Sequence, residues 1–307
     1  MAMPKASPDQ PTVLICLGAA KAGTSWLYDY LASHPDCHLR KIKEVNYFNK
    51  LKGRAWQYMS KTRREQRQVA ERQLGQSMWF QRTKRAALKQ RVKDIDAWLD
   101  IDPAAPGHEA YVRYLCDGRK SQKLVGDFTP EYIALSPDIL REIVSSITDV
   151  RFVLLLRDPV DRVWSHIRMN AERSSQKDRQ FEVHISRQTE KFVSGNHIGM
   201  AERSDYATCL RNLSETVDPS RLHVVFFEHL FAPETGPATL RALTDFLGIA
   251  PKPARFDVVS NQSPEIALDV ENRDRIRTQL QPQYEYCARR FGNELPQRWK
   301  QQMAEAA

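Results

Sequence analysis

Short apolar runs alternate along the chain with stretches of helical periodicity, and this pattern predicts an α/β protein. Runs of strand length lie at Thr12–Leu17, Lys123–Val125, Arg151–Leu156 and Leu222–Phe227. Apolar residues at helical spacing follow them at Thr24–Ser33, Pro137–Ser146, Val160–Asn170 and Thr239–Leu247. The charged region Asp269–Phe291 is also predicted to be helical.

The order of these elements predicts how they assemble. Strands that alternate with helices form a parallel sheet with helices on both faces, and a chain of 307 residues is long enough to bury a stable core. We therefore predict one α/β domain over residues 12–307, with a central parallel sheet, after an N-terminal tail of residues 1–11.

The sequence also indicates in which cellular compartment the protein is expected to work. No apolar run approaches the roughly 18–20 residues that span a bilayer, and no apolar segment with a cleavage site follows the N-terminus. The five cysteines are scattered without CxxC spacing, which fits a reducing compartment better than a disulfide framework or a zinc site. We therefore expect a soluble, cytoplasmic protein with no transmembrane segment.

Positive charge is concentrated in one segment. The chain has a net charge of +8, yet Lys50 to Lys93 holds fourteen Lys and Arg and two acidic residues. We expect surface helices here, within a basic helical insertion over about residues 50–120. A solvated helix face explains most such charges, and a cationic wall that attracts an anionic substrate is the alternative. No zinc-finger spacing, RNP pattern or recognition helix indicates specific nucleic-acid binding.

A loop of small residues, Gly18–Ser25, joins the first predicted strand to its helix. The N–H groups and the dipole at a helix N-terminus favour an anion, and Lys21 and two hydroxyl side chains add donors. The two glycines have the spacing of a P-loop, but Thr24 stands where a P-loop has its lysine. The pattern favours an anion site whose chemistry differs from that of a P-loop kinase.

A second candidate for anion binding is Arg157, which follows the strand Arg151–Leu156 directly. Ligands of α/β proteins bind at the carboxyl edge of the sheet, and the planar guanidinium suits a phosphate. Pro159 is well placed in the first turn of the next helix. The alternative is a surface ion pair between Arg157 and Asp158 or Asp161.

Both segments resemble motifs of one enzyme family. KAGTSWLYDYL (Lys21–Leu31) resembles the 5′-phosphosulfate loop of sulfotransferases that use 3′-phosphoadenosine 5′-phosphosulfate (PAPS). RFVLLLRDPVDRVWSHI (Arg151–Ile167) resembles their second motif, which holds the 3′-phosphate. KEVNYF, DFTPEY, RSDYATCL and FFEHLF resemble segments of the bacterial and heparan-sulfate-type branch. The resemblance implies a P-loop-like sulfotransferase fold.

The resemblance also implies the residues of the donor site. Around the 5′ end these are Lys21, Ala22, Gly23, Thr24, Ser25 and Trp26, and around the 3′-phosphate they are Arg157 and Ser165. Tyr206, Asn261 and Ser263 lie in segments that close over the nucleotide in relatives. Lys21 is expected to stabilise the leaving oxygen, as preorganised charge does in other transfer reactions.

A hydroxyl acceptor needs a general base within hydrogen-bond reach. Resemblance to the heparan-type branch makes Glu44 the first candidate, with Tyr47 and Phe48 expected to keep water from it. A surface ion pair with a neighbouring lysine is the alternative for Glu44. Other candidates for the base are His38, His108 and Asp127.

The implied reaction is an in-line transfer of the sulfuryl group from PAPS to a hydroxyl or amine, which releases adenosine 3′,5′-bisphosphate. No metal is expected, because a lysine can supply the charge that a metal ion supplies in phosphoryl transfer. The acceptor stays open between a small molecule, a lipid and a carbohydrate. Two other functions remain as alternatives: a P-loop-type nucleotide kinase and a non-enzymatic polyanion-binding protein.

Overall fold

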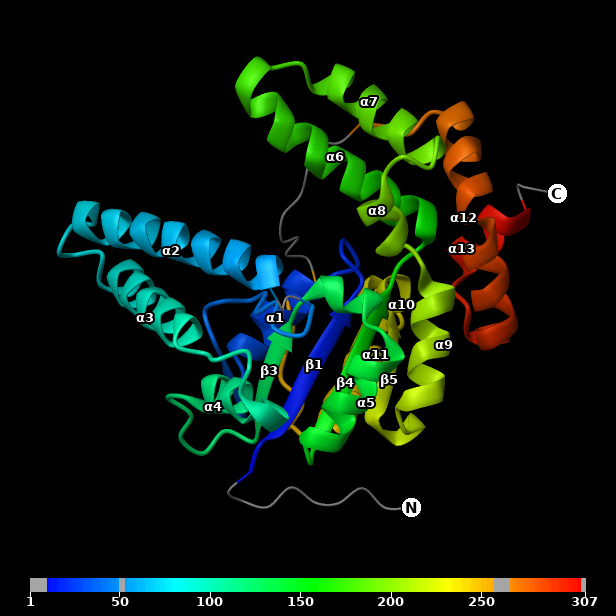
Figure 1. Cartoon of the computed structure of the whole chain (residues 1–307). Coiled ribbons are helices and arrows are strands. Elements are labelled where there is room, and N and C mark those ends of the chain that lie inside the picture. Colours follow the sequence, from blue (N-terminus) through cyan, green and yellow to red (C-terminus); the bar gives the residue numbers. More distant parts are fainter. Residues whose placement is uncertain (1–9, 50–52, 257–265, 305–307) are drawn as a thin grey trace.

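A five-stranded parallel sheet forms the centre of the described structure (Figure 1). The computed structural model describes residues 10–49, 53–256 and 266–304. The strands are β1 (Thr12–Gly18), β2 (Cys37–Leu39), β3 (Leu124–Phe128), β4 (Val150–Leu156) and β5 (Leu222–Phe226), in the order β2-β3-β1-β4-β5. The predicted α/β fold with a central parallel sheet is confirmed.

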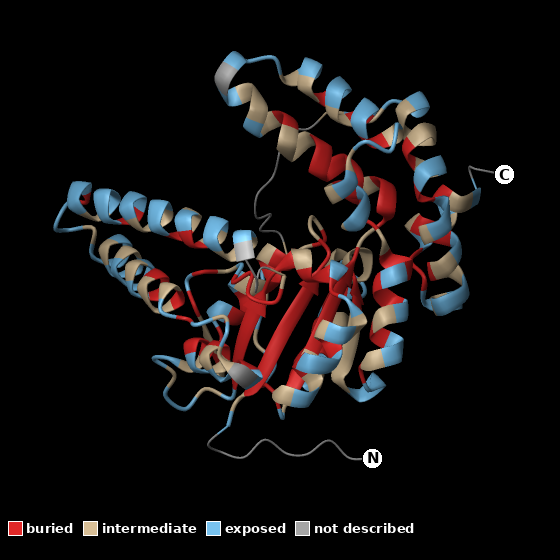
Figure 2. Ribbon diagram, viewed as in Figure 1, coloured by how far each residue is buried: buried red, intermediate tan, exposed pale blue. Residues whose placement is uncertain are grey.

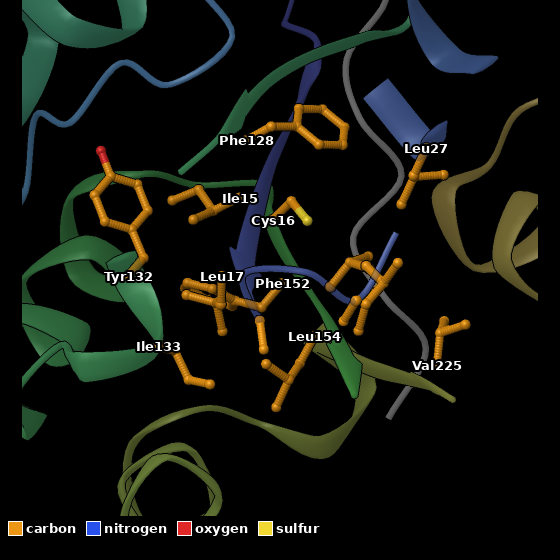
Figure 3. Packing of buried hydrophobic residues seen from close by; sticks show 14 of the residues in the cluster. Ile15, Cys16, Leu17, Leu27, Phe128, Tyr132, Ile133, Phe152, Leu154 and Val225 are labelled. Atoms are coloured by element: carbon orange, nitrogen blue, oxygen red, sulfur yellow. The ribbon is translucent and has the colours of Figure 1, made fainter. Parts of the chain in front are cut away.

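The central strand β1 is buried along its whole length, as expected for a parallel sheet with helices on both faces. Figure 3 shows its side chains alternating, with Ile15 and Leu17 on the side of Ile133 in η2 (Pro130–Ala134). Cys16 points to the opposite side, toward Leu27 of α1 (Thr24–Ala32). Apolar burial on both faces explains why β1 reads as an unbroken apolar run.

Helices that the periodicity predicted are present, with small changes at most ends, although the helix after Pro159 runs eight residues beyond its predicted end at Asn170. They are α5 (Pro137–Ser146), α6 (Pro159–Asp178), α11 (Gly236–Leu247) and α12 (Val270–Phe291). Asp158 caps α6 by accepting from the Asp161 N–H at 2.9 Å, and Pro159 occupies the first turn, as predicted. Gly248, at φ +70°, ends α11.

The sequence did not predict the remaining helices individually. They are α4 (Glu109–Cys116), α7 (Phe181–Val193), α8 (Ile198–Glu202), α9 (Tyr206–Thr216), α10 (Phe227–Phe231), α13 (Gln297–Ala304), η1 (Pro106–His108), η3 (Pro219–Arg221) and η4 (Gly292–Glu294). In the residues that the structure describes, no helix is long and apolar enough to cross a bilayer.

Two strands depart from the sequence prediction. β3 runs to Phe128, three residues beyond the predicted end at Val125, although Asp127 is polar. The buried Asp127 carboxylate fits inside the strand because it accepts hydrogen bonds from the hydroxyls of Thr129 and Tyr132, both at 2.7 Å. The three-residue strand β2 is too short to give a periodic signal, and the prediction missed it.

The basic segment forms a helical hairpin of α2 (Gly53–Gln76) and α3 (Arg82–Leu99). It extends from the side of the sheet (Figure 1), and its far end is mostly exposed (Figure 2). At its base, the rings of Trp56 and Trp98 stack with centroids 4.5 Å apart. The expectation of surface helices in this segment agrees with the structure.

Candidate active site

A cavity of about 970 Å³ lies at the carboxyl edge of the sheet, beyond the ends of β1 and β4. The chain after β1 leads toward β2 on one side of the sheet, and the chain after β4 leads to β5 on the other. Ligands of open α/β sheets bind at this kind of reversal in strand order. The volume lies at the upper end of the range of about 300–1,000 Å³ that is typical of small-molecule sites.

The loop after β1 turns sharply before it enters α1. Lys21 (φ +71°) and Gly23 (φ +91°) both have left-handed backbone conformations. A Cβ atom on Gly23 would lie 3.0 Å from Cε2 of Phe231 in α10, so the limited space favours glycine as well. The turn places the first residues of α1 in the lining of the cavity, and the N–H groups at a helix N-terminus favour an anion.

Thr24 and Ser25 are the first two residues of α1, and their hydroxyl groups contact the same lysine. Nζ of Lys43 donates to Oγ of Ser25 at 2.7 Å and to Oγ1 of Thr24 at 3.4 Å. Burial lowers the pKa of Lys43. Lys43 comes from the segment after β2, so it adds a second ammonium group to the loop from a different part of the chain.

Lys21 lies half-buried among cations. Its Nζ is 3.8 Å from the sulfur of Met169 on α6. Burial lowers its pKa to about 8, and the positive charges of Arg157, Arg173 and Arg168 add to this effect. A bound anion would relieve this repulsion, because it would interact favourably with all four charges.

Arg157 is held at the end of β4 by its neighbours in the cavity. Its Nη1 donates to the Lys21 carbonyl at 3.1 Å, and its guanidinium lies 4.6 Å from the ring centroid of Phe227. The alternative ion pairs do not form, since Asp158 accepts from the Tyr284 hydroxyl and Asp161 pairs with Arg298. The guanidinium therefore bridges the two strand ends.

One face of α6 forms a wall of the cavity. The lining residues are Ser165, His166, Arg168, Met169, Asn170, Glu172, Arg173 and Gln176. Most of them recur three or four residues apart, which is the spacing of one helix face. Ser165 is buried on this face, so the helix brings it to the same cavity as Arg157.

Positive charge dominates the described lining of the cavity. The cations are Lys21, Lys43, Arg157, Arg168, Arg173 and Arg203, and the carboxylates are Glu44, Glu131 and Glu172. Glu131 forms an ion pair with Arg203 and accepts from Asn49 at 2.9 Å. The balance of charge attracts an anionic ligand.

Glu44 lies at the junction of two cavities. It lines the large cavity and a second one of about 480 Å³, formed with Asn46, Ala55, Tyr58, Met59, Thr62, Arg63, Gln66 and Glu131. Glu44 itself is exposed, and Tyr47 and Phe48 point into the core, where they contact Tyr111. The expectation that these two rings keep water from Glu44 is therefore wrong, because they are part of the core.

The other proposed bases lie away from the cavity in the described structure. Asp127 is fully buried and accepts hydrogen bonds from three hydroxyls and from the Val45 N–H, although burial raises its pKa to about 6. His108 is buried against Glu142, and His38 contacts the Asp117 carbonyl. Their places in the fold favour structural roles for all three.

The structure brings most of the predicted site residues together. Lys21, Gly23, Thr24, Ser25, Trp26, Glu44, Arg157 and Ser165 all line the large cavity. Ala22 is buried beneath the loop, and Tyr206 is buried with its hydroxyl donating to the Arg157 carbonyl at 2.9 Å. Tyr206 thus contacts the backbone that carries Arg157. Asn261 and Ser263 lie outside the described residues.

Trp26 is held within an aromatic cluster at the cavity edge. Its indole N–H donates to the Arg255 carbonyl at 2.9 Å, and its ring stacks with those of Tyr30 and Phe256. Only 7% of Trp26 is exposed. The cluster therefore offers Phe256, together with the edge of Trp26, as an apolar wall.

Several cavity residues were missed by the sequence analysis. They are Lys43, Glu131, His166, Arg168, Arg173, Arg203, Phe227, Phe231 and Phe256. The α6 residues could have been found by following helical spacing onward from Ser165. His166 is an uncharged imidazole, since burial lowers its pKa to about 2.

Among the described residues, no cluster of His, Cys, Asp or Glu could hold a metal ion.

Comparisons with known proteins give one family. A model described as "Sulfotransferase family" matches residues 11–253. A crystal structure of a sulfotransferase from Alicyclobacillus acidocaldarius is similar over 95% of this chain and 99% of that chain, with 19% identity and a TM-score of 0.56. No curated protein sequence matches the chain significantly.

Two other solved structures are similar at lower scores. The sulfotransferase domain from the curacin biosynthetic pathway has 18% identity, covers 79% of this chain and 75% of that chain, and has a TM-score of 0.42. The sulfotransferase domain from the Synechococcus PCC 7002 olefin synthase has 17% identity, covers 90% and 97%, and has a TM-score of 0.40.

Proposed function

Because the chain belongs to the sulfotransferase family, we propose that it transfers a sulfuryl group from PAPS to a hydroxyl or amine of an acceptor. One observation carries this proposal: the residues after β1 and those after β4 line a single cationic cavity. A donor with phosphates at both its 5′ and 3′ positions needs two separate anion sites of this kind. The product on the donor side is adenosine 3′,5′-bisphosphate.

The proposed donor site uses the two strand ends for different phosphates. Lys21, the hydroxyls of Thr24 and Ser25, and the N–H groups that begin α1 bind the 5′-phosphosulfate. Arg157 and Ser165 bind the 3′-phosphate. Phe227, Phe231 and Phe256 provide an apolar wall for the adenine ring. The volume and the charge of the cavity both support this fit.

Lys21 is the proposed electrostatic catalyst. Sulfuryl transfer resembles phosphoryl transfer, in which positioning and charge stabilisation provide most of the catalysis. The Lys21 ammonium donates to the bridging oxygen as the bond to sulfur breaks, which stabilises the negative charge of the leaving group. Lys43, beside Thr24 and Ser25, adds charge on the same side. We expect turnover to persist in EDTA.

Glu44 is the proposed general base, and the second cavity is the proposed entrance for the acceptor. Glu44 borders both cavities, so its carboxylate can accept the proton of a nucleophile that enters from the α2 side. The second cavity combines amide, hydroxyl and apolar side chains. This lining suits an acceptor with both hydroxyl and apolar groups, whether a small molecule, a lipid or a carbohydrate.

Donor binding tests the proposal directly. Lys21→Ala and Arg157→Ala should each lower transfer by at least about 100-fold, because each removes a charge-assisted contact to the donor or the leaving group. Transfer from ³⁵S-labelled PAPS to pooled acceptors measures this loss, and calorimetry measures the binding of adenosine 3′,5′-bisphosphate. Arg211→Ala, on the exposed face of α9, is the matched control. Wild-type transfer in both cavity variants would refute the proposed roles.

A separate variant tests the base. Glu44→Gln should lower kcat by about 100-fold, within the range of general-base contributions, while bisphosphate affinity stays unchanged. Glu172→Gln, which removes another carboxylate from the same cavity, should keep most of the kcat. Equal losses in both variants would show that overall charge, and not proton transfer at Glu44, determines the rate.

A further inference from the structure

The turn between α2 and α3 exposes three large apolar side chains in succession. Met78, Trp79 and Phe80 are 56%, 77% and 60% exposed. The rings of Trp79 and Phe80 lie edge to face with centroids 6.1 Å apart. Large apolar side chains that stay exposed together mark an interaction site more often than isolated ones do.

The backbone of this turn is well held, so the exposure does not come from a frayed end. Nη1 of Arg85 donates to the carbonyls of Leu74 and Ser77, at 3.0 and 2.6 Å. Oγ of Ser77 donates to the Gln73 carbonyl at 2.5 Å. These side-chain donors bind carbonyl groups at the end of α2 and in the turn, where the regular N–H partners of the helix end. The turn therefore presents its apolar side chains from a defined scaffold.

The surroundings of the turn are strongly cationic. Seven Lys and Arg and no Asp or Glu lie between Arg72 and Lys93. Arg72, Arg82 and Lys84, the nearest of these to the turn besides Arg85, are exposed. A helix rises about 1.5 Å per residue, so the 24 residues of α2 carry the turn about 36 Å from the base of the hairpin.

We propose that the tip of this hairpin, Met78–Phe80 with its flanking cations, inserts into the interface of an anionic lipid bilayer. Trp and Phe favour the boundary between headgroups and acyl chains. Each Lys or Arg close to the surface is attracted by anionic headgroups. The apolar side chains of the tip therefore suit the boundary with the acyl chains, and the cations behind them suit the anionic headgroups.

The size and the charge of the tip favour lipid over a protein. An aromatic side chain buries about 150–250 Å², so three large side chains offer less than the roughly 800 Å² per partner of a stable protein interface. A symmetric dimer through this tip would bring together two clusters of like charge. A nucleic acid would be held in a groove lined with aromatics, whereas these three side chains occupy a protruding turn (Figure 1).

Vesicle flotation of the full chain tests the inference. The wild type should bind equimolar phosphatidylcholine and phosphatidylglycerol vesicles and not phosphatidylcholine vesicles. The double variant Trp79→Ala/Phe80→Ala should bind at least about tenfold more weakly, because it loses most of the apolar contact. Arg82→Gln/Lys84→Gln should lose a similar amount, and this binding should weaken with salt.

Matched variants separate the tip from the rest of the surface. Val270→Ala removes an equally exposed apolar side chain on α12, and Lys191→Gln/Arg289→Gln removes two exposed cations elsewhere. Both should bind like the wild type. Thermal melting followed by circular dichroism should show the same transition for all variants, since none of these side chains is buried.

Fluorescence gives an independent measure of insertion. Trp79 is exposed, whereas the five other tryptophans are partly or fully buried. Anionic vesicles should shift the emission to the blue and protect it from a water-soluble quencher, and Trp79→Phe should lose this response while it keeps vesicle binding. The inference is overturned if no vesicle binds, if the tip variants bind like the wild type, or if the tip instead mediates a dimer or preferential DNA binding.

Discussion

Lys21 illustrates how the fold sets the chemistry of a single side chain. Its left-handed backbone conformation turns it into the cavity, and α6 and the end of β4 surround it with guanidinium groups. Burial and these charges lower its pKa to about 8. The free protein therefore loses the charge of Lys21 as the pH rises through about 8.

This pKa predicts a proton linkage to ligand binding. Bound phosphates favour the charged form of Lys21 and raise its pKa again. At pH 8.5, binding of adenosine 3′,5′-bisphosphate should take up about half a proton or more, and at pH 6.5 Lys21 should contribute almost none. Calorimetry in buffers of different ionisation enthalpy measures the uptake.

The control for this linkage is Lys21→Arg, since a guanidinium keeps its charge over the whole range. The variant should bind the bisphosphate without the additional proton uptake at pH 8.5. Equal uptake in the wild type and in Lys21→Arg would assign the proton to another group.

At the scale of the elements, the conformation of the loop after β1 depends on the close contact between the end of β1 and η2. Gly18 has φ +126°, and a Cβ atom there would lie 2.7 Å from the carbonyl oxygen of Pro130. Both the backbone conformation and the lack of space require glycine. The close approach fixes where β1 ends and thus where the turn proposed to bind the 5′-phosphosulfate begins.

Two glycine variants test this requirement. Gly18→Ala should lower the free energy of unfolding by about 2 kcal/mol or more. Gly75→Ala, in α2 with nothing within 4 Å of the added Cβ, should leave stability unchanged or raise it by up to about 1 kcal/mol. Urea denaturation measures both. If Gly18→Ala is as stable as the wild type, the close approach to Pro130 does not restrict this position.

At the scale of the whole molecule, the basic hairpin contacts the segment that carries Glu44, the proposed base. Arg63 of α2 is buried, stacks over the ring of Trp98 at 5.3 Å, and donates to the Glu44 carbonyl. The Trp98 indole N–H donates to the Val45 carbonyl at 3.0 Å. The hairpin therefore positions the segment that carries the proposed base, and we propose that residues 50–120 act as one insertion within a single domain.

This connection predicts an effect on turnover from outside the donor site. Arg63→Met should lower kcat by about tenfold, because Glu44 loses a fixed position, while the Kd for adenosine 3′,5′-bisphosphate stays unchanged. Arg67→Met, on the same helix but paired with Asp96 and Glu71, should have little effect on either constant. Arg63→Lys should recover part of the loss. An increase in Kd alone would indicate that Arg63 acts on the donor site instead.

The sequence determined the family and located the two motifs proposed to bind anions, because each motif is a contiguous strand, turn and helix start. The same local signals located Lys21, Thr24, Ser25 and Arg157 at strand ends. In β3, which contains the polar Asp127, the apolar pattern ended three residues too early. The hydroxyls that satisfy this carboxylate come partly from another element, so a local pattern cannot register them.

Only the tertiary structure decided which distant side chains share the cavity. Nζ of Lys21 lies close to the sulfur of Met169, although the two residues are 148 positions apart in the sequence. Nζ of Lys43, in the segment after β2, donates to Oγ of Ser25. The tertiary structure also placed Tyr47 and Phe48 in the core, left Glu44 at the surface between two cavities, and buried Tyr206. These outcomes depend on how helices pack against a sheet, and that packing is set by contacts between residues far apart in the chain.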